Sequence, residues 1–459
     1  MAGTTGLKPL ASAVAVAPWY KPAVPQTDQP ALVRAIGRWS LAALAVNSMI
    51  GSAVFGLPSV LASLVGTASP VAVLLGGAVT AVMIACYAEV ASRFAQAGGT
   101  YLYVRVAFGR LAGIQVGWFW LLAALTARAG AANLFVIYVG EFWPRATHTI
   151  PRFLILTTLV GILAAVNYRG VRAGTQMSNV FVVAKLLPLG IVCLVGAFYL
   201  IAAHHVIPAA APPAGAGAWL KVMLLLTFAY GGYEAALIPM SEAKDPRRDV
   251  ALALFVALIT VTLLYTLIQW IVMGVLPDPA HSARPLADAA RILMGKGGAA
   301  LIAIGALVSV FGYLSAGMLT GPRYTLALAE QGDSPSSFAA VHPQFRTPHF
   351  SILFIAIAIW LLALVGSFSW NVTLSAVAKL FFLGLVCAAL PVLRKKQTGA
   401  AAFQLPGGPV FAVLGVAICV GLLAGVDMGQ SLIVGGTFFI ALLNWLLVRR
   451  ATPISSLTP

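Results

Sequence analysis

Two hydrophobic stretches of the chain are interrupted near their middles by residues that break helices. The first, residues 50–58, contains Gly51 and Pro58, and the second, residues 228–234, contains two adjacent glycines. A bilayer offers no water to satisfy free backbone N–H and C=O groups, so such breaks persist only where protein or a bound solute takes up those groups. Paired breaks in two halves of a chain predict a solute site near the midplane of a membrane.

The chemistry that a broken helix offers is non-covalent binding. Its N-terminal end supplies free N–H groups and a partial positive charge, and its C-terminal end supplies carbonyls and a partial negative charge. A zwitterionic α-amino acid fits this pair, with its carboxylate on N–H groups near Gly51 to Val54 and its ammonium on carbonyls of both broken helices. The glycines could instead serve only close helix packing. One such stretch would favour packing, whereas two at matched positions favour the binding site.

The elements that must position these breaks are membrane helices. Hydrophobic residues make up 61% of the 459 and charged residues 9%, and apolar stretches about as long as the ~20 residues needed to cross a bilayer recur along the chain. They lack the period-2 alternation of β-barrel strands. We therefore predict an all-α polytopic membrane protein. Its twelve expected spans lie near residues 38–62, 67–93, 112–140, 151–167, 178–202, 218–241, 250–276, 299–327, 350–366, 370–393, 409–426 and 430–448.

The basic residues lie mainly on one side of the predicted membrane. Of 28 Lys and Arg, five lie on one face, four lie within or at the ends of spans, and nineteen lie on the face that carries both termini. The positive-inside rule makes that face cytoplasmic. We expect an integral protein of the cell (inner) membrane with both termini in the cytoplasm. The same rule accounts for the net charge of +16 without a nucleic-acid partner.

The ends of the chain and its cysteines carry less information. Residues 1–35 lack the continuous apolar core of a signal peptide and are predicted to form a cytoplasmic tail, as are residues 450–459. Because every cysteine falls inside a predicted span, we expect neither a disulfide framework nor a disulfide-linked partner. These cysteines are Cys86, Cys193, Cys387 and Cys419.

The positions of the two breaks define a repeat. They fall in spans 1 and 6, so the repeating unit is five helices, and an odd-numbered repeat must invert in the membrane. This predicts the LeuT-type 5+5 inverted repeat with broken helices 1 and 6 and two extra C-terminal helices. The two repeats are residues 36–202 and 203–393, and helices 11 and 12 occupy 394–449.

Several motifs resemble those of one transporter family. Residues 50–55 (Ile-Gly-Ser-Ala-Val-Phe) resemble the GSGIF signature of the amino acid-polyamine-organocation (APC) family, and residues 228–234 resemble its FAYxGxE signature in helix 6. The match runs from about residue 36 to 350. Other stretches similar to family patterns are residues 87–89 with 98–101, residues 242–248, and residues 342–348.

The resemblance implies a substrate site, position by position. It places the carboxylate on Gly51, Ser52 and Ala53, and makes Phe228 an aromatic gate. The family usually has Gly where this chain has Ala53, whose added methyl could tighten the pocket toward small or slim side chains or could point away from it. The ammonium is expected on carbonyls near Met49, Ile50, Phe228 and Gly231. The full set of expected substrate-binding residues is Met49, Ile50, Gly51, Ser52, Ala53, Val54, Phe228, Tyr230, Gly231 and Glu234.

Lys185 lies about eight residues into span 5, too deep to reach the interface easily, and a buried lysine needs a reason. Many APC relatives place a helix 5 lysine where sodium-coupled relatives place a cation, held by helix 1 and helix 8 groups. Burial lowers the affinity of a lysine for its proton, whereas carbonyl partners raise it. Such a group can couple proton movement to transport. The alternative is a permanently charged strut between helices 1, 5 and 8.

Three further ionisable residues lie within predicted spans: Arg128, Glu234 and Lys379. Glu234 could counter a cationic substrate side chain, but a structural ion pair is the favoured interpretation, with Arg128 as its expected partner. Lys379 has no role assigned from the sequence.

The sequence favours transport over other functions. We predict a secondary active transporter of amino acids, by proton symport or by exchange (antiport). Neutral substrates are favoured because the expected pocket is mostly apolar, and a cationic amino acid or polyamine carrier is the alternative that Glu234 keeps open. A binding sensor would be supported by a large cytoplasmic domain, and a membrane enzyme by clustered His and acidic residues; the sequence shows neither. No metal is expected, because no two histidines are spaced i, i+4 on a helix, and ATP is not expected as the energy source, because no Walker motif occurs. No cofactor is expected.

Overall fold

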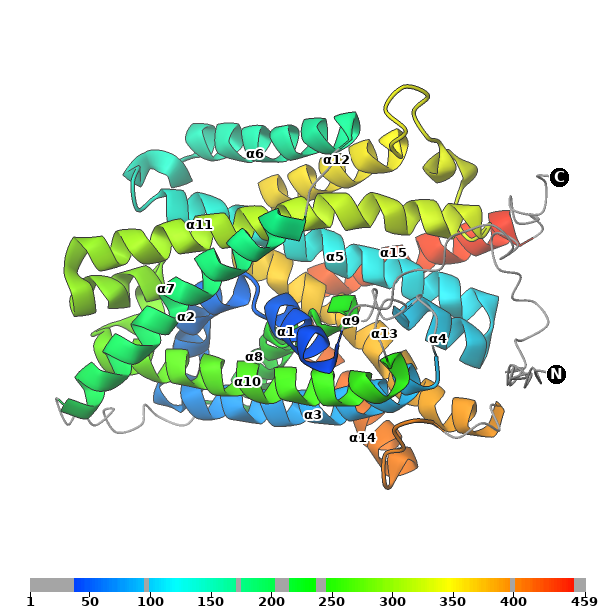
Figure 1. Cartoon of the computed structure of the whole chain (residues 1–459), viewed down its shortest axis with the longest axis horizontal. Coiled ribbons are helices and arrows are strands. Elements are labelled where there is room, and N and C mark those ends of the chain that lie inside the picture. Colours follow the sequence, from blue (N-terminus) through cyan, green and yellow to red (C-terminus); the bar gives the residue numbers. More distant parts are fainter. Residues whose placement is uncertain are drawn as a thin grey trace, which may run out of the picture.

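The protein is a bundle of membrane helices. A computed structural model describes residues 37–94, 99–170, 175–202, 214–236, 245–396 and 401–449 (Figure 1). In these ranges every regular element is a helix, as the long apolar stretches predicted. The tails predicted at 1–35 and 450–459, and the part of the predicted sixth span beyond residue 236, lie outside the described residues.

The helices follow one another along the chain with short connections. They are α1 (Arg38–Met49), α2 (Ala53–Val65), α3 (Ser69–Ser92), α4 (Gly99–Phe108), α5 (Arg110–Val139), α6 (Thr149–Arg169), α7 (Thr175–Ala202), α8 (Ala216–Ala229), α9 (Tyr233–Ala236), α10 (Pro246–Val275), α11 (Pro285–Glu330), α12 (His349–Val365), α13 (Phe368–Lys396), α14 (Gly408–Leu423) and α15 (Met428–Val448). Short 3-10 turns lie at Gly66–Ala68, Pro144–Thr147, Pro279–His281 and Ser336–Ala339.

The apolar character of these helices identifies a polytopic membrane protein. Within the described ranges, eight helical stretches are long and apolar enough to cross a bilayer, the first of which joins α2 and α3. Three shorter helices, α8, α12 and α14, are also apolar. Many of their large side chains face outward, such as Leu194 on α7 at 75% exposure and Val413 on α14 at 71%. Exposed apolar surface of this extent suits a lipid environment rather than water.

Two helices differ from the sequence prediction. Helix α4 occupies a segment that was expected to be a connection between spans 2 and 3. Helix α11 begins at Pro285, well before the expected span at 299–327, and Gly295 interrupts it with a φ of 70°. That φ is accessible mainly to glycine, so the residue lets a short outer helix turn into the long membrane helix.

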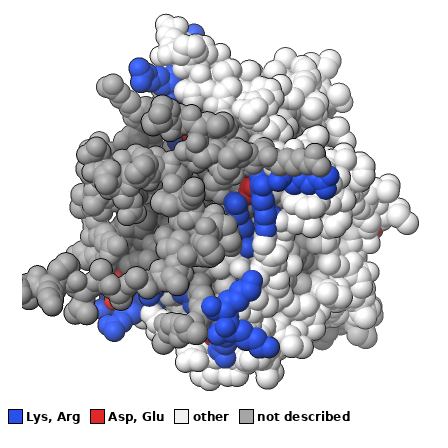
Figure 2. All heavy atoms as spheres, turned by 90° about the vertical axis from the view of Figure 1, so that its right-hand side faces the viewer, with Lys and Arg blue, Asp and Glu red and all other residues white. Residues whose placement is uncertain are grey.

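Hydrogen bonds define one end of the bundle. Arg110 at the start of α5 donates to the carbonyls of Gly332, after α11, and Val448, at the end of α15, at 2.8 and 3.0 Å. Arg394 on α13 pairs with Glu89 on α3 at 2.6 Å. Figure 2 shows the end face at which α11 and α15 finish, and basic side chains gather there in several clusters with few acidic ones. This is the face to which the sequence assigned most of the basic residues.

The opposite end is held by its own polar contacts. Arg284 and Arg291 both pair with Glu141, which follows α5. Arg152 on α6 donates to the carbonyls of Ala363 and Gly366, at the end of α12, at 2.6 and 3.0 Å. These arginines are three of the five basic residues that the sequence assigned to the sparsely charged face.

Helices α5 and α13 form a packed pair inside the bundle. Phe119 of α5 stacks on Phe381 of α13 with ring centroids 4.4 Å apart. Farther along, the Ser375 hydroxyl donates to the Ala123 carbonyl at 2.8 Å. The pair provides a firm wall beside the broken helices, because Gly56 of α2 packs against Leu134 of α5 and Phe368 of α13.

Candidate functional site

The first predicted break is present. Helix α1 ends and α2 begins with residues 50–52 between them, and Ile50 is extended at φ −76°, ψ 91°. No side chain caps α2. In the described part of the chain the backbone N–H groups of Ser52, Ala53 and Val54 have no hydrogen-bond acceptor. These groups carry the partial positive charge of a helix N-terminus.

Gly51 stands beside these N–H groups with open space in front of it. A Cβ added to Gly51 would meet no other atom within 4 Å, although the neighbouring Ile50 and Ser52 are buried. The break therefore presents unsatisfied donors next to open space at the half-buried Gly51. An anionic group of small size can approach the backbone here.

The second predicted break is also present. Helix α8 ends at Ala229, and Gly232 has a φ of 108° before α9 begins. A side chain at Gly232 would collide with the carbonyl of Ser48 in α1. The two breaks thus touch, and the glycine is needed both for its backbone angle and for this close approach.

The broken helices cross in opposite directions. Helix α2 packs on α8, while α1 packs on α9. The second half of the first broken helix therefore lies beside the first half of the other one, so the two run antiparallel. In Figure 1 they lie at the centre of the bundle, with α3 and α10 along one side.

Lys185 and Tyr265 hold the end of α1. The Lys185 ammonium donates to the carbonyls of Asn47 and Ile50 at 2.8 and 2.6 Å. The Tyr265 hydroxyl of α10 donates to the Met49 carbonyl at 3.0 Å. The expected contact of Lys185 with helix 1 is confirmed by these two bonds. The carbonyls named as ammonium ligands at Met49 and Ile50 therefore already have protein donors.

Glu234 forms an ion pair, but with a partner other than the expected one. Its carboxylate lies 3.0 Å from the Lys379 ammonium of α13, and both side chains are at least nine-tenths buried. It also accepts a hydrogen bond from the Gly232 N–H at 2.8 Å. The hypothesis that Arg128 pairs with Glu234 is wrong. Lys379, unassigned by sequence, fills that role because α13 passes beside the second break.

Arg128 instead lies across the side chain-free surface of Gly317 on α11. It is 7% exposed, and its Nε and Nη1 atoms have no hydrogen-bond partner among the described residues. The guanidinium therefore lies between α5 and α11, and no carboxylate of the described residues neutralises it.

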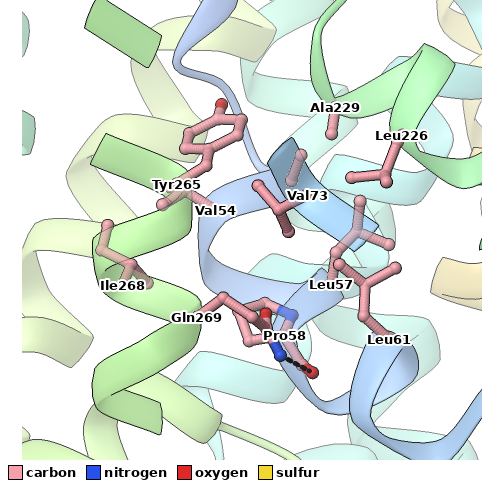
Figure 3. A pocket seen from close by; sticks show the side chains of 11 residues that line it. Val54, Leu57, Pro58, Leu61, Val73, Leu226, Ala229, Tyr265, Ile268 and Gln269 are labelled. Atoms are coloured by element: carbon pink, nitrogen blue, oxygen red, sulfur yellow. Dashed lines mark hydrogen bonds between the residues drawn. The ribbon is translucent and has the colours of Figure 1, made fainter. Parts of the chain in front are cut away.

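A small apolar cavity adjoins the N-terminus of α2 (Figure 3). Its volume is about 20 Å³, enough for roughly one water molecule. Two of the expected site residues, Ala53 and Val54, line it with side chains of α3, α8 and α10. The one hydrogen bond drawn in Figure 3 joins the Gln269 amide to the Pro58 carbonyl at 3.1 Å. An amino acid side chain needs more room, so this region must open to admit one.

The remaining expected residues lie near the breaks in different roles. Phe228 packs beside the Lys379 ammonium, which lies 5.8 Å from its ring centroid, and its carbonyl accepts from the Gly231 N–H at 3.0 Å. Tyr230 is fully buried, and its hydroxyl donates to the Val73 carbonyl on α3 at 2.8 Å. The predicted set is therefore gathered around one crossing point, although Tyr230 and Glu234 already have polar partners within the protein.

Sequence reasoning missed two residues of this region. Tyr265 and Gln269 both come from α10, where they project toward α2. The only available signal was a glutamine and a tyrosine one turn apart within an otherwise apolar span, and polar residues there are uncommon and often functional.

Two crossed, broken helices inside an apolar bundle are typical of membrane transporters that bind a solute between them. Comparison with known families specifies the class: the profile of the amino acid permease family matches residues 36–448. The chain belongs to this family of amino acid transporters, within the APC group. The resemblance drawn from the two signatures is confirmed.

Three transporters of Bacillus subtilis are similar along most of their length. The methylthioribose transporter is 25% identical over 86% of this chain and 88% of its own. The branched-chain amino acid permease is 26% identical over 92% of both chains. The serine/threonine exchanger is 27% identical over 85% of this chain and 90% of its own.

Proposed function

We propose that this protein carries neutral amino acids across the cell membrane by alternating access. The observation that supports this most directly is the set of unpaired N–H groups at Ser52, Ala53 and Val54 beside the open space at Gly51. A substrate carboxylate would satisfy these donors, and its ammonium would lie toward carbonyl oxygens at the ends of α1 and α8. The bonds of Lys185 and Tyr265 leave each α1 carbonyl a second lone pair.

The neutral selectivity is supported by the surroundings of the break. The cavity beside α2 is lined by aliphatic side chains with Tyr265 and Gln269, and it contains no charged residue. Glu234, the carboxylate that could attract a cationic side chain, is neutralised by Lys379 at 3.0 Å. Two of the similar transporters are described as carriers of branched-chain amino acids and of serine or threonine. A cationic substrate would require the buried ion pair to break.

The proposed architecture is the LeuT-type 5+5 inverted repeat with twelve spans and two additional C-terminal helices. The antiparallel crossing of the two broken helices supports an inverted relation between the repeats. We place the end that carries most basic side chains in the cytoplasm, with both termini on that side.

We further propose that Lys185 couples transport to protons. Its ammonium bonds to two neutral carbonyls at the end of α1, and no carboxylate lies within ion-pair distance in the described ranges. Release of the proton would loosen α1 from α7, which links the charge of Lys185 to the position of the broken helix. In the exchange alternative, the same two bonds form a permanent strut between α1 and α7. The similarity to a serine/threonine exchanger supports this alternative.

Binding is tested first by thermal shift of the purified protein against the twenty amino acids and common polyamines. A ligand that binds only the folded state raises its melting temperature. We expect a few neutral amino acids to stabilise the native protein and the variant Ser52→Leu to lose that response. Stabilisation by polyamines or lysine alone would contradict the neutral assignment.

Coupling is tested with proteoliposomes. If Lys185 moves a proton, an inward proton gradient drives uptake into vesicles without internal amino acid, and Lys185→Gln abolishes this uptake while amino acid exchange between preloaded and external pools persists. If native protein takes up substrate only into preloaded vesicles, whatever the pH gradient, the protein is an exchanger and Lys185 is a strut.

A further inference from the structure

A second cavity lies at the basic end of the bundle, away from the broken helices. Its volume is about 320 Å³, roughly ten times the share of one liquid water molecule. It opens between the last turn of α6, the last third of α11, and the first turn of α12 with the loop before it. None of its lining residues belongs to the predicted substrate site.

Three arginines, Arg169, Arg323 and Arg346, line this cavity, and none of its lining residues is acidic. Within the described ranges none of the three forms an ion pair. Arg323 directs one guanidinium nitrogen to the Leu319 carbonyl at 2.6 Å, and this is its one hydrogen bond among the described residues. The cavity therefore concentrates positive charge without internal compensation.

The loop that supplies Arg346 is fixed against α6. The Thr347 hydroxyl donates to the Tyr168 carbonyl at 2.8 Å, and the His342 N–H donates to the Thr347 carbonyl at 2.8 Å. Among the described non-glycine residues, Arg346 alone has a positive φ, 52°. Residues held in this region of backbone space are strained and occur preferentially at functional sites.

Apolar side chains continue outward from the cavity along two membrane helices. On α6, Ile162 and Val166 are 52% and 48% exposed, and on α12, Leu353 and Ile357 are 47% and 54% exposed. Helices α6 and α12 pack on each other. The cationic cavity is thus the end of an apolar surface that faces the bilayer.

We propose that this cavity binds the headgroup of an anionic phospholipid, with the acyl chains lying along α6 and α12. Guanidinium groups bind phosphate oxygens through paired hydrogen bonds, and basic pockets between membrane helices suit anionic headgroups. A soluble phosphate would use the arginines but gain nothing from the adjoining apolar surface. A lipid uses both.

The test compares ligands on the purified full-length protein in detergent. Phosphatidylglycerol is titrated while the melting temperature is followed, with phosphatidylcholine and inorganic phosphate as separate arms. We expect phosphatidylglycerol to stabilise the native protein, and the double variant Arg169→Gln/Arg346→Gln to bind it about tenfold or more weakly, given about 1 kcal/mol for each arginine near an anionic lipid. Equal stabilisation by inorganic phosphate would overturn the lipid assignment in favour of a soluble anion.

The matched control is Arg248→Gln/Lys395→Gln, which removes the same charge from two exposed positions elsewhere at this end. It should respond to phosphatidylglycerol like the native protein. An equal loss of stabilisation by phosphatidylglycerol in both double variants would show that net charge alone attracts the lipid. That result would overturn the proposed lipid site.

A second measurement does not depend on a variant folding. A photoactivatable phosphatidylglycerol, cross-linked to the native protein, should label residues 318–323 of α11 or 345–352 around the start of α12. Labelling that avoids both segments would contradict the proposal.

Discussion

At the residue scale, the buried charges near the breaks are Lys185, which donates to the end of α1, and the Glu234–Lys379 ion pair. Lys185, Glu234 and Lys379 were each recognisable as ionisable groups inside apolar spans. Which of them meet depends on how helices far apart in the chain pack, and no local pattern carries that information. The bond from Lys185 to α1 was predictable only because a related family shows one. The Glu234–Lys379 pair had no such guide.

The Glu234–Lys379 pair is expected to stabilise the fold. Both side chains are buried and 3.0 Å apart, and removing one member of a buried ion pair typically costs about 3–5 kcal/mol. Glu234→Lys and Lys379→Glu should each lower the melting temperature and the yield of folded protein, and the combined charge swap should recover much of both. Thermal unfolding of the purified variants measures this.

Arg128 provides the matched control for that experiment. It is equally buried but has no ion-pair partner in the described ranges, so Arg128→Met removes a charge without leaving another one unpaired. We expect its melting temperature to stay within a few degrees of the native value or to rise. A loss as large as that of Lys379→Met would show that burial of any cation, rather than the pair, governs stability.

At the element scale, the breaks were the most predictable feature of the fold. Glycines in an apolar span weaken a helix wherever they occur, and two matched positions in the chain made a shared site the better interpretation. The sequence did not reveal α4 or the early start of α11, because both lie in segments whose residues also suit an irregular connection. Nor could it reveal that α10 supplies Tyr265 and Gln269.

The two break glycines should respond differently to the same substitution. A methyl at Gly51 enters open space, whereas one at Gly232 meets the Ser48 carbonyl and a φ of 108°. Gly232→Ala should therefore destabilise the protein by about 1–3 kcal/mol or more. Gly51→Ala should fold with little change in melting temperature and bind amino acid more weakly, because the methyl occupies the space assigned to the substrate carboxylate.

Melting curves with and without ligand separate these effects. If Gly51→Ala bound substrate as well as the native protein, the carboxylate would lie elsewhere. If Gly232→Ala were as stable as the native protein, the close contact between the two breaks would be unnecessary for folding.

At the scale of the whole molecule, the charges orient the bundle. Helix ends linked by Arg110 and Arg394 form one face, and those linked by Arg152 and Glu141 form the other. In a bilayer placed between these two faces, the unpaired N–H groups of α2 lie in the hydrocarbon region and the arginine cavity lies at one surface.

The proposed placement of the basic end in the cytoplasm can be tested by cysteine accessibility. All four native cysteines are buried, so a membrane-impermeant maleimide should report mainly on introduced sites. Lys395, at the basic end, and Lys296, near the start of α11, are both exposed. In intact cells Lys296→Cys should be labelled and Lys395→Cys should be labelled only after the membrane is opened. The reverse pattern would invert the protein in the membrane and place the arginine cavity at the outer surface. Because the positive-inside rule is a statement about loop charge alone, that outcome would leave the proposed binding site at the breaks unaffected.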